Sequence, residues 1–527
     1  MTALLPAPLS ADIGGAGLTL DRATAITAAS PDAEAAARAV QRVLALTTGL
    51  PLPIEGSGAI QVALDAELPE EGYRLVVEAD RVEIVAGSPR GAGWAAQTLL
   101  QLAPAQIYTA PLGVPVPLGG ARIEDAPRFA WRGAMLDPSR HFVPLHDVID
   151  FINWMARHKL NVFHWHLTDD HGWRVAWDKY PRLAEVASWR TKTSNRFWGD
   201  DGTPHGGYYT LDQIKAVADY ARSLGIETVP ELDFPGHVTA LLAAYPEFAT
   251  DPSALDGVAH YPEIHHNVLN FSDEAMEFVH GIWEQVIEAT GARHVHIGGD
   301  EVPTTHWVAS KEVAERAKDF GVEDVSKVQR WFTLHMRDWL NERGVTPIGW
   351  DEVVDDGVIE SMICQCWREA DKGGRAAEGG MEVIMSPLSH TYYDFYQSAD
   401  PEEPYAQGDI TTWEKAYSFD PTEGLSPEAA GRVLGTQFQL WSEFLQNYRH
   451  VQYSAWPRGC ALAEVAWSDP AGRDVAEFRG RLEGHLERLA AGGVNYRPLE
   501  GSHPWQLGGQ GWRRRPPGDG ENPPTEG

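Results

Sequence analysis

Cysteine and basic residues are both scarce in this 527-residue sequence. Its three cysteines, Cys364, Cys366 and Cys460, are too few for a disulfide framework. Cys364 and Cys366 lie two residues apart on a predicted strand, and we interpret them as packed thiols. The 43 Lys and Arg residues face 75 Asp and Glu, for a formal net charge of −32. Phosphate repels such a surface, so nucleic acid and anionic membranes are not expected partners.

Long apolar segments and a leader pattern are also missing. No stretch approaches the ~20 uninterrupted apolar residues of a membrane helix. Residues 1–10 lack the basic n-region and the apolar h-region of a signal peptide. The expected compartment is therefore the cytoplasm, and a secreted protein stays the alternative because a trimmed leader would leave the same sequence. The 20 tryptophans suit both core packing and the apolar faces of sugar rings.

Residues 1–125 are predicted to form a small α+β domain. Two short alternating strands are expected within 73–87, and helices are expected over 31–49 and 91–103. The Pro/Gly-rich segment 110–120 is interpreted as the connection to the following domain.

From about residue 129 the pattern changes to strands that alternate with amphipathic helices. Helices are expected over 144–159, 211–224, 273–289 and 327–343. Candidate strands begin at eight positions: Phe129, Asn161, Ile226, His294, Thr346, Met362, Glu382 and Val433. Eight such units predict a parallel (β/α)8 TIM barrel, of the α/β class, over 126–497.

An alternative fold and a C-terminal tail complete the prediction of the domains. An open doubly wound sheet is the alternative, and it normally carries an early Gly-rich phosphate turn, which does not stand out in this sequence. The segment 498–527 is rich in Pro, Gly and charge and is expected to be a disordered tail.

Polar side chains gather where the predicted strands end, which is where barrel enzymes place their active sites. The strand ends read "MLDPSRHF", "FHWHLTDDHGW", "PELDFPGH", "GGDE", "GWDE", "QCWR", "TYYDFY" and "LWSE". The charged side chains and histidines of the first four include Asp137, Arg140, His164, His166, Asp169, Asp170, His171, Glu231, Asp233, His237, Asp300 and Glu301. A purely structural barrel has no need for this convergence, so we expect a catalytic site.

Asp300 and Glu301 follow an apolar strand and two glycines in "HIGGDE". Both side chains can reach one pocket only if the strand ends there, because neighbouring strand residues point to opposite faces. Two adjacent carboxylates do not both ionise easily, so one can remain protonated and act as an acid. The same letters occur in GGDEF-type nucleotide cyclases, but those place them on a hairpin of a small mixed domain.

A metal site is a further alternative. His164-Trp-His166 and His294-Val-His296 both read H-x-H on a strand, a spacing that puts two rings on one face. Barrel amidohydrolases carry this motif on the first strand, where this chain has Asp137 and Arg140 instead. We therefore favour hydrogen-bonded histidine packing and expect no metal and no cofactor.

The ordered set "RGAMLDPSRHF", "NVFHWHLTDDHGWR", "PELDFPGH", "HIGGDE", "GWDE", "CWR" and "LWSE" resembles the β-N-acetylhexosaminidases of glycoside hydrolase family 20. The resemblance covers about 129–490, and 1–125 looks like the family's N-terminal α+β domain. It implies an exo-acting retaining enzyme that releases terminal β-linked N-acetylglucosamine, or N-acetylgalactosamine, from oligosaccharides and glycoconjugates such as chitooligosaccharides.

The resemblance also implies roles for individual residues. Glu301 would be the general acid and base, and Asp300 would hold the substrate's 2-acetamido group, whose oxygen attacks the anomeric carbon. Asp169 and His237 would form a dyad that tunes the acid, with Asp170 as the alternative to Asp169.

The substrate contacts follow from the same resemblance. Tyr392 would bond the acetamido oxygen, with Tyr393 as the alternative register. The other implied substrate-binding residues are Arg140, Trp350, Trp367, Trp441, Asp394 and Glu443. A lacto-N-biosidase-like glycosidase of the same family and a non-catalytic carbohydrate-binding barrel stay as alternatives.

Overall fold

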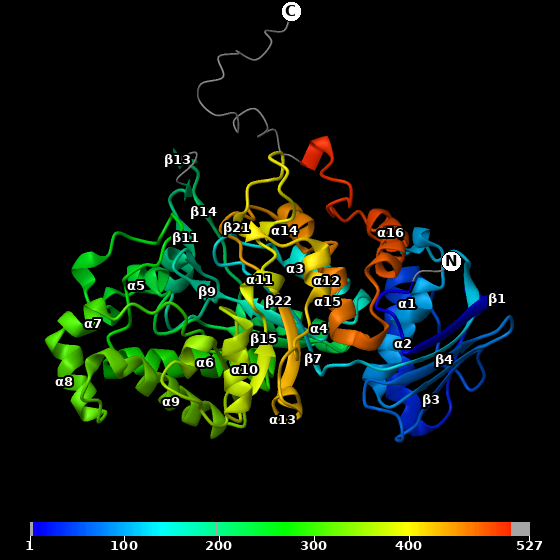
Figure 1. Cartoon of the computed structure of the whole chain (residues 1–527), viewed down its shortest axis with the longest axis horizontal. Coiled ribbons are helices and arrows are strands. Elements are labelled where there is room, and N and C mark those ends of the chain that lie inside the picture. The colour runs from blue at the N-terminus through cyan, green and yellow to red at the C-terminus, as the bar shows by residue number, and fades with distance from the viewer. Residues whose placement is uncertain (1–3, 196–198, 507–527) are drawn as a thin grey trace, which may run out of the picture.

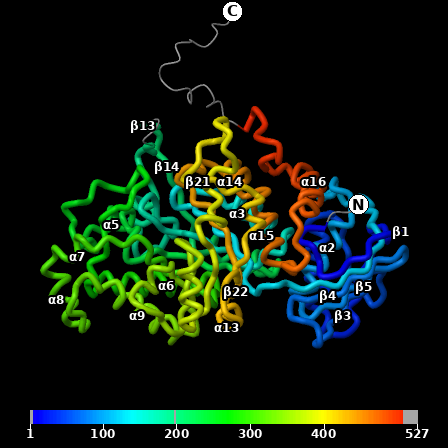
Figure 2. Tube along the Cα trace, in the orientation of Figure 1, coloured from blue at the N-terminus to red at the C-terminus, as the bar shows by residue number. Residues whose placement is uncertain are grey.

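A computed structural model of the chain describes residues 4–195 and 199–506. Within these residues a mixed sheet with two helices precedes a closed barrel ringed by helices (Figure 1). Figure 2 shows that the C-terminal helix α16 (Val475–Ala491) runs beside the N-terminal unit, although the two lie at opposite ends of the sequence. None of the described helices is long and apolar enough to cross a membrane.

The N-terminal unit is a six-stranded sheet of order β1-β6-β4-β5-β3-β2. Its strands are β1 (Ser10–Leu20), β2 (Ile26–Ala28), β3 (Ile60–Leu64), β4 (Tyr73–Val77), β5 (Val82–Ala86) and β6 (Val116–Asp125). Helices α1 (Glu34–Thr48) and α2 (Pro89–Gln101) pack against each other on it. Ser88 caps α2, and α1 ends at Gly49 in the left-handed region.

The predicted connection at 110–120 differs from what the structure shows. Residues from Val116 onward belong to β6, which pairs antiparallel with both β1 and β4. The chain therefore leaves the N-terminal sheet only after Asp125, and the first barrel strand begins at Trp131.

The predicted barrel is confirmed. Its strands are β7 (Trp131–Leu136), β8 (Val162–His166), β15 (Glu227–Glu231), β16 (His294–His296), β17 (Thr346–Trp350), β18 (Ile363–Cys366), β19 (Glu382–Met385) and β22 (Val433–Leu440). They close in the order β15-β16-β17-β18-β19-β22-β7-β8, and every neighbouring pair is parallel. All eight begin within two residues of the predicted starts.

The predicted helices are also present. They are α3 (Leu145–Arg157), α4 (Leu211–Ser223), α6 (Asp273–Thr290) and α9 (Val328–Asn341). A capping box of Thr210 and Gln213 starts α4, while Ser272 caps α6. Further helices are α5 (Thr239–Ala244), α7 (Thr305–Ala309), α8 (Lys311–Asp319), α10 (Ala370–Glu378), α11 (Leu388–Thr391), α12 (Trp413–Ser418), α13 (Pro427–Ala430), α14 (Tyr448–Ala455) and α15 (Arg458–Trp467).

Two buried ion pairs join the N-terminal unit to the barrel. Arg132 of β7 pairs with Glu71, and Lys159 pairs with Asp125 at 2.7 Å. Trp467 of α15 donates its indole N–H to Asp125 at 2.8 Å. The two ion pairs and this hydrogen bond are buried, so they fix how the two units sit against each other.

The segment predicted as a disordered tail begins in ordered structure. A 3₁₀ helix spans Pro504–Gln506, and the buried Gln506 amide donates to the Tyr496 carbonyl at 2.7 Å. The remainder of the predicted tail, 507–527, lies outside the described residues.

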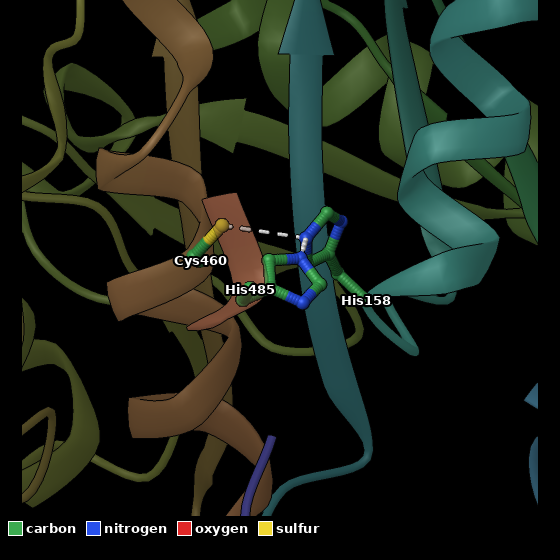
Figure 3. Close-up of side chains that lie close together, drawn as sticks. All are labelled: His158, Cys460 and His485. Carbon is green, nitrogen blue, oxygen red and sulfur yellow. Dashed lines mark hydrogen bonds between the residues drawn. The ribbon is translucent and has the colours of Figure 1, made fainter. Parts of the chain in front are cut away.

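A buried polar cluster joins α3, α15 and α16 (Figure 3). The Nε2 atoms of His158 and His485 lie 2.9 Å apart, and Cys460 Sγ lies 3.3 Å from His158 Nε2. His158 Nδ1 donates to the Trp154 carbonyl at 2.7 Å, and Arg488 donates to His485 Nδ1 at 3.3 Å. These partners fit two neutral imidazoles in which His485 Nε2 donates to His158 Nε2, so hydrogen bonding accounts for the cluster.

This cluster predicts a loss of stability in acid. Burial lowers the pKa of His158 to about 3, and it lowers the pKa of His485 well below its usual range. The unfolded chain binds these protons near pH 6.5, so the folded state is fully favoured above pH 6.5 and loses stability as pH falls from 6.5 towards 3. Each histidine should cost about 1.3 kcal/mol of unfolding free energy between pH 7.5 and pH 5.5.

Urea unfolding at the two pH values tests this expectation in the wild type and in His158→Gln. The variant should lose less stability between pH 7.5 and pH 5.5, by about the contribution of one histidine. His146→Gln is the matched control, because the His146 side chain is 81% exposed. Equal pH dependence in the wild type and His158→Gln would contradict the assignment of a neutral buried imidazole.

Candidate active site

The predicted site residues lie at or beyond the carboxyl ends of the barrel strands. Arg140 follows β7, Asp169 follows β8, His237 follows β15, and Asp300 with Glu301 follows β16. Trp350 is the last residue of β17. The other predicted residues follow the last three strands: Trp367, Tyr392, Asp394, Trp441 and Glu443. The closed parallel barrel therefore collects all of them at one end.

The turn after β16 directs both neighbouring carboxylates to one place. Gly298 and Gly299 have φ of 68° and 93°, and Glu301 itself has φ of 49°. This run of left-handed residues ends the strand, so Asp300 and Glu301 do not alternate between faces. Asp300 Oδ2 and Glu301 Oε2 each lie 3.7 Å from His237 Nε2.

Glu301 has the properties of a proton donor. Burial raises the pKa of its carboxyl, and the neighbouring Asp300 carboxylate raises it further. Its side chain is still 36% exposed, so an incoming molecule can reach it. A carboxyl whose pKa is raised and which remains accessible is suited to general acid catalysis.

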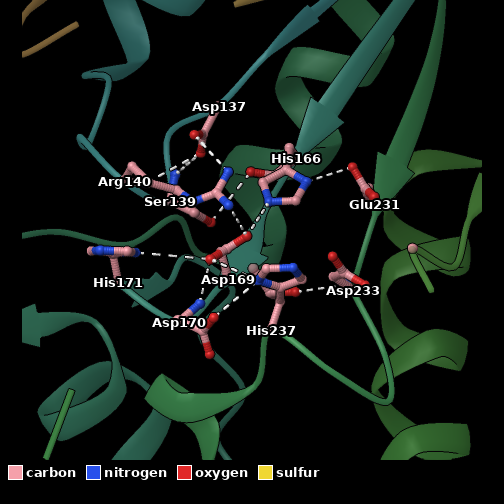
Figure 4. A network of polar contacts seen from close by, with 12 residues as sticks. Asp137, Ser139, Arg140, His166, Asp169, Asp170, His171, Glu231, Asp233 and His237 are labelled. Atoms are coloured by element: carbon pink, nitrogen blue, oxygen red, sulfur yellow. Dashed lines mark hydrogen bonds and ion pairs between the residues drawn. The ribbon is translucent and has the colours of Figure 1, made fainter. Parts of the chain in front are cut away.

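His237 is held by Asp170 (Figure 4). His237 Nδ1 and Asp170 Oδ2 are 2.9 Å apart, whereas the nearest Asp169 oxygen is 3.7 Å away. The predicted dyad of Asp169 and His237 is therefore corrected: the hydrogen-bond partner of His237 is the alternative residue, Asp170. Burial alone would lower the pKa of His237, but Asp169, Asp170 and Asp300 outweigh it and raise that pKa well above its usual range.

Asp169 instead belongs to the network around Arg140. Its Oδ2 accepts from Arg140 at 2.7 Å and lies 3.0 Å from His166 Nε2. Asp137, a residue without a predicted role, holds Arg140 from the other side at 3.1 Å. The guanidinium also lies 4.9 Å from the Trp441 ring centre. Arg140 is thus fixed in one orientation at the floor of the site.

Two further carboxyls lie near Arg140. Asp169 and Glu443 raise the pKa of the Arg140 guanidinium above its usual range despite its burial. Burial raises the pKa of Asp394, and Glu443 raises it further. Asp394 is buried, and its Oδ1 has no hydrogen-bond partner among the described residues. Arg140, Asp394 and Glu443 therefore offer donors and acceptors of the kind that sugar hydroxyls bind.

Four aromatic side chains form a cage beside Asp300. Ring centres lie 5.7 Å apart for Trp350 and Trp441, 6.4 Å for Tyr392 and Trp441, and 6.2 Å for Trp367 and Tyr392. Burial raises the pKa of the Tyr392 hydroxyl well above its usual range, and the Asp394 and Asp300 carboxylates raise it further. Tyr393, the alternative register, is fully buried and donates to the Arg458 carbonyl at 3.1 Å. The cage contains Tyr392 and not Tyr393.

Three of the four H-x-H histidines, His164, His166 and His296, lie around Glu231, whereas His294 pairs with Glu227 at 2.8 Å. Glu231 Oε2 lies 2.8 Å from His164 Nε2 and also pairs with His166 Nδ1. Its Oε1 accepts from Trp350 Nε1 at 2.9 Å. The Gln437 amide lies 2.8 Å from His164 Nδ1, which leaves Nε2 as the protonated nitrogen facing Glu231. This pattern fits hydrogen-bonded packing that supports the Trp350 wall.

Glu352 is a further residue without a predicted role, although "GWDE" was among the strand ends. Its Oε2 accepts from Trp367 Nε1 at 3.0 Å. Burial, together with the nearby Asp300 carboxylate, raises the pKa of Glu352 to about 8. It therefore holds one wall of the cage while remaining uncharged near neutral pH.

Family models match nearly the whole of this architecture. The model described as the catalytic domain of glycosyl hydrolase family 20 matches residues 129–470, and that described as domain 2 of the family matches 1–126. The chain belongs to glycosyl hydrolase family 20. It is therefore a glycoside hydrolase, with the family's second domain preceding its catalytic barrel.

Named relatives in this family agree in activity. The chain is 35% identical over 503 residues to a β-hexosaminidase of Porphyromonas gingivalis, covering 94% of this chain and 64% of that protein. It is 32% identical over 468 residues to a β-hexosaminidase of Akkermansia muciniphila, covering 87% of this chain and 92% of that one. The chain thus spans just under two thirds of the Porphyromonas protein and most of the Akkermansia one.

Solved structures of the family superpose on the chain as well. An exo-β-N-acetylglucosaminidase of Vibrio harveyi in complex with N-acetylglucosamine aligns with a TM-score of 0.84 at 31% identity, over 94% of this chain and 78% of that one. An N-acetyl-β-hexosaminidase of Streptomyces plicatus aligns with a TM-score of 0.79 at 31% identity, over 94% and 96% of the two chains.

Proposed function

We propose that this family 20 enzyme is an exo-acting, retaining β-N-acetylhexosaminidase that uses the substrate's own acetamido group as nucleophile. It would release terminal β-linked N-acetylglucosamine, with N-acetylgalactosamine as a second substrate. The relatives support the choice of sugar, since the Vibrio harveyi structure holds N-acetylglucosamine. The site geometry supports the route.

The first step uses Glu301 and Asp300 in different roles. The acetamido oxygen attacks the anomeric carbon and forms the oxazolinium ring. The bond from that carbon to the leaving oxygen breaks, and Glu301 gives its proton to that oxygen. Asp300 accepts the acetamido N–H and stabilises the positive charge that spreads over the ring.

The second step runs the proton transfer in reverse. A water molecule gives its proton to the Glu301 carboxylate and adds to the anomeric carbon. The carbon–oxygen bond of the ring breaks, and the acetamido group is restored. Two inversions at one carbon leave the sugar in its original β configuration. The protons balance without a metal or cofactor.

The observation that carries this proposal is the environment of Asp300. Its negative charge acts on Tyr392, which forms a cage with three tryptophans, and Arg140 lies 4.9 Å from the ring centre of one of them, Trp441. Such a cage suits a small apolar methyl with a neighbouring amide, which is what an acetamido group presents. A glycosidase with an enzyme nucleophile has no need for this enclosure next to its second carboxylate.

A pair of aryl glycosides tests the proposal. The 4-nitrophenyl β-N-acetylglucosaminide should be turned over, while the 4-nitrophenyl β-glucoside, which lacks only the acetamido group, should react at least ~10³-fold more slowly because it has no internal nucleophile. The 4-nitrophenyl α-N-acetylglucosaminide serves as the control for anomeric selectivity. Equal kcat/KM on the two β-linked substrates would refute acetamido participation.

A further inference from the structure

Asp233 is a buried carboxyl next to Asp300 that the proposed reaction does not use. It follows β15, and one atom each of Asp233, His237 and Asp300 lie within 4.8 Å of one another. Asp233 Oδ1 accepts the Gly299 N–H at 3.0 Å, and the backbone N–H of Asp233 donates to Thr168 Oγ1 at 3.0 Å. Asp233 is therefore anchored through Oδ1 and its backbone N–H, and Figure 4 shows its carboxyl near His237.

Asp233 and Asp300 each have one carboxyl oxygen left without a partner. Asp233 Oδ2 and Asp300 Oδ1 are both buried atoms without a hydrogen-bond partner among the described residues. An ionised carboxylate oxygen that is buried without a hydrogen-bond donor is unfavourable. If Asp300 accepts the acetamido N–H with one oxygen, its other oxygen still needs a donor. A protonated Asp233 supplies that donor.

The charges around Asp233 agree with a protonated carboxyl. Burial raises the pKa of Asp233 well above its usual range, and Asp300 raises it further. Glu231 acts in the same direction, while His237 and His166 act against it without reversing the shift. Two carboxyl groups whose atoms lie within 4.8 Å of each other carry one negative charge more readily than two.

We propose that Asp233 is a positioning residue that keeps its proton and donates a hydrogen bond to Asp300. Asp300 is then the ionised member of the pair and is held with its second oxygen towards the acetamido group. This inference rests on the proposed function, because that function assigns the acetamido contact to Asp300.

The glycine pair of "HIGGDE" has its explanation in this arrangement. A Cβ atom added to Gly298 would overlap Oδ1 of Asp233, and Gly298 has a φ of 68°. Gly299 supplies the N–H that anchors the same oxygen. The turn is therefore shaped to admit the Asp233 carboxyl beneath Asp300.

Two substitutions separate a donor role from a charge or a packing role. Asp233→Asn keeps a neutral donor and an acceptor of the same shape, and kcat should stay within about threefold of the wild type. Asp233→Leu has neither, and kcat should fall about 10- to 100-fold with a smaller change in KM, because a hydrogen bond to a charged group is lost. Exposed Asp178→Asn is the matched control.

The protonation itself has two readouts. At pH 7 the infrared spectrum should show the carbonyl stretch of a protonated carboxyl that Asp233→Asn loses and Asp178→Asn keeps. The acidic limb of kcat/KM should not move in Asp233→Asn. A shift of that limb by about one unit to lower pH, or an infrared band that Asp233→Asn leaves undiminished, would show an ionised Asp233 and overturn the proposal.

Equal activity of Asp233→Leu and Asp233→Asn, with the melting temperatures unchanged, would also overturn it. These outcomes are distinguishable from failure of the proposed function. The infrared band requires no substrate, whereas acetamido participation is decided by the two aryl glycosides.

Discussion

Glu301→Gln should lower kcat/KM for chitooligosaccharides by about 10³-fold or more, because glutamine keeps the size of the side chain but cannot give a proton to the leaving oxygen. The loss should be much smaller for the first step with a dinitrophenyl glycoside, whose leaving group departs without a proton. In the wild type, kcat/KM should fall as pH rises through the raised pKa of Glu301, since the acid must be protonated to act. That alkaline limb should vanish in the variant.

Kinetics over a series of leaving groups, with Glu277→Gln as the control on the exposed face of α6, measures both effects. A loss in Glu301→Gln that is the same for good and poor leaving groups would remove Glu301 from the role of acid.

Asp300→Asn should lower kcat by about 10²- to 10³-fold with a much smaller change in KM. The asparagine keeps the shape of the side chain, but the negative charge that stabilises the oxazolinium ion is lost. Because the internal nucleophile and not the leaving group is impaired, the loss should be similar for dinitrophenyl and alkyl leaving groups. This is the opposite of the pattern expected for Glu301→Gln.

Steady-state kinetics on the same substrates, together with calorimetric titration of N-acetylglucosamine, separates binding from reaction in this variant. An unchanged kcat, or a loss that appears entirely in KM, would contradict the assigned role of Asp300.

The barrel was predictable because its signals are local. Strands buried on both faces read as short apolar runs, and helices such as α3 and α6 carry a clear apolar face between them. β1 carries no such signal. It is Gly-rich, largely exposed and interrupted by register shifts, and its partner β6 lies about a hundred residues away. The Pro and Gly residues of 110–120 likewise predict a linker, because no local sequence pattern indicates that β6 pairs with both β1 and β4.

The site was predictable as a set of residues and less so as a set of contacts. The strand ends identified which carboxylates and tryptophans meet, because parallel strands all deliver their next residues to one end. Which of Asp169 and Asp170 faces His237 depends on the short pairing of Thr168–Asp169 with Gly172–Trp173. The meeting of Asp233 with Gly298 joins residues 65 positions apart, and no spacing rule connects them.

The buried pairs Arg132–Glu71 and Lys159–Asp125 have a consequence for how far this enzyme is modular. Each pair draws one partner from the N-terminal unit and one from the barrel, in contact with Trp94 and Trp467. A barrel separated from its first 125 residues would present Arg132, Lys159 and a bare tryptophan surface, each without its counterpart. We therefore expect the two units to unfold together, although the sequence divides them near residue 125. The catalytic barrel depends on the N-terminal unit to cover these charged and apolar side chains.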